Sequence, residues 1–134
     1  MTNKELYDRV LKGESLGDIA LKHNTRYDVG EVSYSENNKY VIIDMHEDKL
    51  AVARHFSSQV SVWRFIETLA IYELIKRTLN NTPTNELPGE VLQSIKKARV
   101  VVPSNFGTSP DTVIFFRYSH DGVLEMHDTE YYDY

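Results

Sequence analysis

The sequence predicts an α+β fold, with an N-terminal helical hairpin and an antiparallel sheet of about five strands packed on one long central helix. Three patterns lead to this prediction. Short amphipathic segments with capping residues fill the N-terminal region, segments rich in β-branched residues and tyrosine alternate with turns, and one apolar segment of helical period lies mid-chain. A chain of 134 residues is near the usual size of one domain, so we expect a single domain over residues 1–134.

The helical hairpin is predicted from two short segments that are separated by a glycine. Residues 3–12 carry apolar side chains four positions apart, and Gly13 follows where many helices end in a left-handed residue. Ser15 and Asp18 have the spacing of a capping box, which predicts a second helix to about Asn24.

Strands are predicted in both halves of the chain. Residues 26–35 and 39–45 should form a hairpin, and residues 50–56 should add a third strand. After the long helix, residues 112–118 are apolar on both faces, which is typical of a strand in the middle of its sheet. A turn at 119–122 should then lead into a returning strand.

The returning strand is predicted over residues 123–128. Before the central strand, a short helix over 90–97 is followed by three valines, 100–102, and then by a loop over 104–111 that is rich in glycine, proline and serine. Such a loop is expected to lie on the surface.

The long helix is predicted over residues 58–80. Ser57 or Ser58 can cap its start, and the segment from Asn80 to Pro83 should end it. Apolar residues cover most of its circumference. A helix of this kind is either central in its fold or has one face in an interface, such as one between two copies of the chain in a homo-oligomer.

Composition excludes several classes of chemistry. The chain has no cysteine, so it has no disulfide, thiolate metal site or cysteine nucleophile. The N-terminus lacks an apolar signal core, and no apolar run reaches the length of a membrane span. We therefore expect a cytoplasmic protein that does not act at a membrane.

The acidic charge is concentrated at the C-terminus. The net charge is −5, and the segment from Ser119 to the end holds five acids and no lysine or arginine. Such a segment repels phosphate backbones and suits a basic protein surface, and its tyrosines offer a large contact area. The sequence therefore predicts a protein partner with a basic surface and no nucleic acid, and the predicted contact residues are Asp128, Glu130, Tyr131, Tyr132, Asp133 and Tyr134.

One segment resembles known modules. Residues 12–24, KGESLGDIALKHN, resemble the first helix of a helix-turn-helix and also the opening of a lysin motif. The first resemblance implies a DNA-binding regulator with a recognition helix over 26–34 and an exposed Arg26, and the second implies peptidoglycan binding. Both families need a second helix immediately afterwards, but Gly30, two acids and β-branched residues make a poor helix there.

Histidines beside carboxylates suggest a second alternative, a small metal-dependent hydrolase. Imidazole and carboxylate groups together can bind a divalent metal or act as a general base. None of these pairs has the spacing of a known metal motif, so no cofactor is expected and the metal question stays open. The candidates are His46, Asp48, His55, His120, His127 and Asp128.

The function predicted from the sequence is therefore that of a small non-enzymatic binding protein. No catalytic motif accounts for the serines or histidines, whereas acidic and aromatic residues gather at one end of the chain. An inhibitor, an adaptor or an assembly component fits this description. In size and composition the chain is similar to small acidic accessory proteins of phages and of bacterial immunity systems.

Overall fold

The predicted α+β class is confirmed by a computed structural model, which describes residues 1–32, 39–104 and 111–131. Within these ranges the chain forms four α-helices, one short 3-10 helix and six strands. The elements are α1 (Asn3–Leu11), α2 (Leu16–Lys22), β1 (Tyr27–Glu31), β2 (Tyr40–Asp44), β3 (Lys49–Leu50), α3 (Gln59–Leu79), η1 (Thr84–Glu86), α4 (Gly89–Lys97), β4 (Val100–Val102), β5 (Asp111–Tyr118) and β6 (Leu124–Tyr131).

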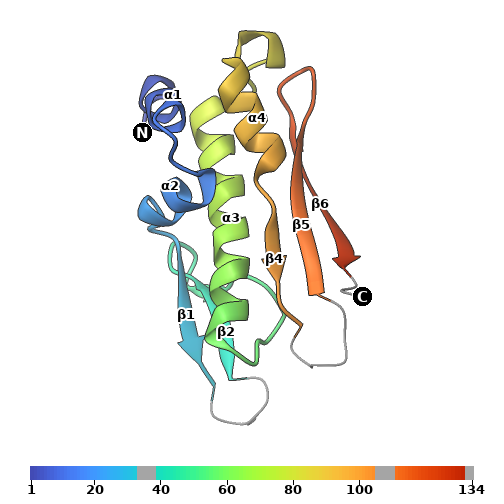
Figure 1. The fold of residues 1–134 in the computed structure, drawn as a ribbon. Helices are drawn as coiled ribbons and strands as arrows, with labels where there is room; N and C mark the ends of the chain where they lie inside the picture. Colours follow the sequence, from blue (N-terminus) through green and yellow to red (C-terminus); the bar gives the residue numbers. More distant parts are fainter. Residues whose placement is uncertain (33–38, 105–110, 132–134) are drawn as a thin grey trace.

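The strands form two sheets where the sequence predicted one. One three-stranded antiparallel sheet has the order β1-β2-β3 and the other has the order β4-β5-β6. Helix α3 runs through the centre of the molecule and contacts strands of both sheets (Figure 1). Because a central helix offers apolar side chains on several sides, it can cover one face of each sheet, and the strands need not join into one layer.

The N-terminal helical hairpin forms as predicted. Gly13 has a φ of 96°, and the Ser15 hydroxyl accepts a hydrogen bond from the Asp18 N–H at the start of α2. Helix α2 ends at Lys22, two residues earlier than expected. The side chain of Asn24 instead donates to the Tyr27 carbonyl and accepts from the Tyr27 N–H, which turns the chain into β1.

Helix α3 is central, as one of the two readings of its apolar pattern required. Ser58 caps its start by accepting from the Ser61 N–H at 3.2 Å, and Asn80 ends it with a φ of 44°. Two apolar side chains near its start stay exposed, Val60 at 62% and Trp63 at 42%. The buried positions are Ser61, Val62, Ile66, Thr68, Ala70, Ile71, Leu74, Ile75, Thr78 and Leu79.

The predicted third strand is much shorter than expected. Of residues 50–56, only Leu50 lies in β3, and the chain returns to β2 through an isolated bridge between Phe56 and Tyr40. The fully buried Phe56 ring lies 5.4 Å from the ring of Phe65 on α3. Burial of this large aromatic side chain against the helix takes the place of a continuous strand ladder.

The second sheet has β5 in the middle, as its apolar pattern predicted. Ile114 and Phe116 of β5 are buried towards the helices. The returning strand β6 extends to Tyr131, three residues beyond the expected end, because residues 111–113 of β5 also pair with it. Among the helices of the described ranges, none is long and apolar enough to cross a membrane.

Candidate functional site

Strand β6 contains the first part of the predicted contact segment. It pairs antiparallel with β5 without interruption, from Leu124 opposite Tyr118 to Tyr131 opposite Asp111. The backbone of Asp128, Glu130 and Tyr131 therefore belongs to an edge strand of the sheet. The other three predicted contact residues, Tyr132, Asp133 and Tyr134, lie outside the described residues.

One face of the β5–β6 pair carries a cluster of aromatic and charged side chains. His127 stacks on Phe115 with ring centroids 5.6 Å apart and planes 19° apart, and the Arg117 guanidinium lies 5.7 Å from the Phe115 ring centroid. The His127 Nε2 is 3.1 Å from a Glu125 carboxylate oxygen. On the same face Val101 of β4, opposite Val113, is 43% exposed. We call this side, which is opposite to buried Ile114 and Phe116, the outer face of the sheet.

The inner side of β6 is only partly covered. Leu124 is buried, but Met126 and Asp128 are exposed although they lie opposite the buried Phe116 and Ile114. The edge strand thus projects past the helices that cover β5, and it presents an acid at Asp128 as well as at Glu125 on the outer face.

The turn between β5 and β6 is anchored to the segment that follows α3. Gly122 has a φ of 87°, and a Cβ atom at this position would lie 2.5 Å from the Asn81 carbonyl carbon. The Tyr118 hydroxyl donates to the Thr82 carbonyl, and the Thr84 N–H donates to the His120 carbonyl at 3.4 Å. These contacts fix the position of the hairpin, and therefore of β6, relative to the central helix.

The histidine and carboxylate pairs do not converge. His46 and Asp48 lie in the turn between β2 and β3, and His120 lies in the turn between β5 and β6. His127 and Asp128 are successive residues of one strand, so their side chains point to opposite faces. Over the described ranges, no three His, Asp or Glu side chains are placed to hold a metal ion.

The segment in which a helix-turn-helix would need its recognition helix contains a strand, as its own residue pattern predicted. Residues 27–31 form β1, and Arg26 is not free to read DNA bases, because its guanidinium donates to both carboxylate oxygens of Asp44 at 2.8–3.1 Å. The Arg26 guanidinium holds the pKa of Asp44 below its usual value. This ion pair joins the start of β1 to the end of β2, which is a structural role.

The segment Lys12–Asn24, which resembles the start of a helix-turn-helix and of a lysin motif, also has a structural role. Arg9 of α1 donates to both carboxylate oxygens of Glu14 at 2.7 and 2.8 Å, and its Nη1 is 2.7 Å from the His23 Nε2. Hydrogen bonding to Arg9 lowers the pKa of Glu14 to about 2. The charged residues of this segment therefore hold α1 and α2 together.

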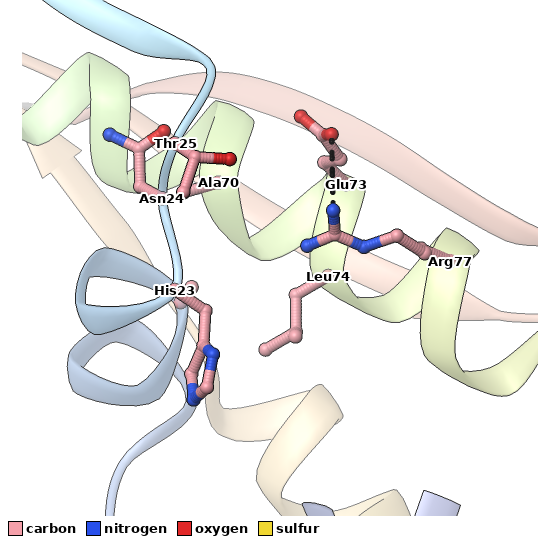
Figure 2. A pocket seen from close by; sticks show the side chains of 8 residues that line it. His23, Asn24, Thr25, Ala70, Glu73, Leu74 and Arg77 are labelled. Carbon is pink, nitrogen blue, oxygen red and sulfur yellow. Dashed lines mark ion pairs between the residues drawn. The ribbon is translucent and has the colours of Figure 1, made fainter. Parts of the chain in front are cut away.

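A polar hollow lies between the end of α2 and helix α3. Figure 2 shows His23, Asn24 and Thr25 on one side of the hollow and Glu73 and Arg77 of α3 on the other. Glu73 and Arg77 form an ion pair with an N–O distance of 3.9 Å. The enclosed volume is about 10 Å³, which is at most room for one water molecule. The hollow is therefore too small for a substrate.

Sequence reasoning missed the residues of the outer face. Phe115 and Arg117 were read only as parts of an apolar strand, and Glu125 was not counted as a contact residue. A signal was present, because folding the chain about the turn at Gly122 pairs Phe115 with His127 and Arg117 with Glu125. No protein family, curated protein or solved structure was found to match this chain.

Proposed function

We propose that this protein is a small non-enzymatic binding protein that recognises a basic surface on a protein partner through β6 and the outer face of its sheet. The observation that carries the proposal is the arrangement of charge. The five acids that make the chain negative all follow Ser119. Two of them, Glu125 and Asp128, have exposed side chains on β6, at the edge of a sheet.

Aromatic and apolar groups beside these acids support the same function. Phe115, His127 and the exposed Val101 lie on the outer face, where they can add apolar contact to the electrostatic attraction. Aromatic side chains are common at the centres of protein interfaces, and charges at the rim accelerate association and select partners of opposite charge. An inhibitor, an adaptor and an assembly component would all use this kind of contact.

The charge dependence of binding tests the proposal. The variant E125Q/D128N/E130Q removes three negative charges while it keeps similar side-chain volumes. Affinity capture from a native extract, at low and at high salt, should recover basic proteins with the wild type and lose them with this variant or with salt, because exposed charges are screened at high ionic strength.

A matched control removes the same charge elsewhere. Asp8, Glu31 and Glu86 are exposed acids outside β6, and D8N/E31Q/E86Q should capture the same proteins as the wild type. The proposal is wrong if both triple variants lose the captured proteins equally, which would indicate an effect of net charge alone. It is also wrong if neither variant loses them.

A further inference from the structure

The free edge of β6 is a regular run of backbone hydrogen-bonding groups. β6 is the last strand in the order β4-β5-β6, and across the described parts of the chain no other strand pairs with its far side. The β5–β6 register runs from Leu124 to Tyr131 without a bulge, and β6 contains no proline. An open edge is a template for another strand, and natural edges are protected by prolines, bulges or charges; of these β6 has only the charges, which are acidic.

The register also identifies which residues face the open edge. The Ser119 N–H donates to the Val123 carbonyl at 2.8 Å, which makes these two residues a hydrogen-bonded pair. Hydrogen-bonded and non-hydrogen-bonded pairs alternate along an antiparallel ladder. Glu125, His127 and Thr129 therefore bond to β5, whereas the N–H and C=O groups of the even-numbered residues, including Met126 and Asp128, point away from it.

The charge along this edge selects the strand that can add to it. Glu125 on the outer face and Asp128 on the inner face flank the edge, and β6 contains no lysine or arginine. A second copy of β6 would add three more acids, and no lysine or arginine, to an edge that is already acidic. A strand that carries lysine or arginine would instead place its cations beside these acids on both faces.

We propose that an extended, basic segment of the protein partner adds to β6 as a fourth strand of the sheet. This inference rests on the proposed function and specifies the form of its partner. Backbone hydrogen bonds to the even-numbered residues of β6 would supply affinity, and the acids would supply the preference for a basic segment. The anchored turn at Gly122 holds the edge in place before binding.

The test uses a synthetic peptide that repeats Lys-Lys-Val-Val, about ten residues long to match a strand, so that lysines lie on both of its faces. On binding, the amides of Met126 and Asp128 should exchange with solvent at least about ten-fold more slowly, since they gain hydrogen bonds. The amides of Glu125 and His127 already bond to β5 and should change much less. The same peptide with glutamate in place of every lysine should cause no change.

Two controls separate backbone pairing from charge attraction. N-methylation of every second residue of the lysine peptide keeps its charge but blocks one backbone edge, and it should abolish the slowing. Met126→Pro removes an outward N–H without removing a bond to β5, and should weaken peptide binding at least about ten-fold while circular dichroism stays unchanged. If this variant unfolds, the methylated peptide still decides the question.

The outcomes distinguish the two proposals. Binding that depends on Glu125 and Asp128 but leaves the exchange of Met126 and Asp128 unchanged would overturn strand addition and leave the proposed function standing. No difference between the lysine and glutamate peptides would overturn both. Protection of Met126 and Asp128 in the free protein that rises with protein concentration would show that a second copy occupies the edge, and would also overturn the inference.

Discussion

Gly122 should be among the least replaceable glycines of the chain. Its φ of 87° costs any residue with a side chain about 1–2 kcal/mol. A Cβ atom there would also lie 2.5 Å from the carbonyl carbon and oxygen of Asn81 and 2.8 Å from the Thr82 oxygen. These are backbone atoms, so the chain itself must move, and the hydrogen bond from Tyr118 to Thr82, worth about 1 kcal/mol, would be strained. We expect Gly122→Ala to lower the free energy of unfolding by about 3 kcal/mol.

Gly13 provides a matched control for this prediction. Its φ is 96°, but a Cβ atom there would meet nothing within 4 Å. Gly13→Ala should therefore show only the backbone cost of about 1–2 kcal/mol, and the gain from a stiffer unfolded chain is the same in both variants. Urea unfolding at constant m-value measures the two losses. Equal losses for the two variants would refute the account of the anchored hairpin.

Three further predictions concern stability. The pKa of Glu14 is lowered from 4.5 to about 2, so its ion pair with Arg9 should stabilise the fold above pH 4.5 and lose this effect as the pH falls towards 2. Measured between these pH values, the free energy of unfolding of Glu14→Gln should therefore depend less on pH than that of the wild type. Tyr118→Phe should cost about 1 kcal/mol in urea unfolding, because the Thr82 carbonyl loses its donor. Gly17→Ala places a Cβ atom 2.1 Å from the Glu67 Oε1, the far end of a flexible side chain that can turn away at the expense of its ion pair with Arg64. The gain from helix propensity, at most about 1 kcal/mol, should therefore be smaller in the wild type than in a Glu67→Ala background, which thermal unfolding of the two pairs can measure.

Local patterns in the sequence were sufficient to predict the four α-helices and most of their ends. Gly13, Ser15 and Ser58 act through neighbouring backbone groups, so the residues that decide these ends lie within a few positions of them. The middle position of β5 was also predicted from its continuous apolar run, although only its inner face is buried and Arg117 on its outer face is exposed.

The division into two sheets was not predictable in the same way, since it depends on contacts between distant residues. Phe56 pairs with Tyr40 and packs against Phe65, and this long-range burial ends the third strand early. The C-terminal end of β6 was also missed. Whether the strand ends at residue 128 or at residue 131 depends on how many residues of β5 are available to pair with it. The proposed contact residues were chosen by charge and aromatic content, and placing Asp128, Glu130 and Tyr131 on an open edge required the register.

The most direct test of the account is amide hydrogen exchange along β6 of the free protein, because both proposals depend on an open, acidic edge. The account predicts alternation, with slow exchange at Glu125, His127 and Thr129, which bond to β5, and fast exchange at Met126 and Asp128, which face solvent. Uniformly slow exchange would mean that the edge is already occupied, and uniformly fast exchange would mean that β6 does not form a stable ladder. Either result would contradict the account.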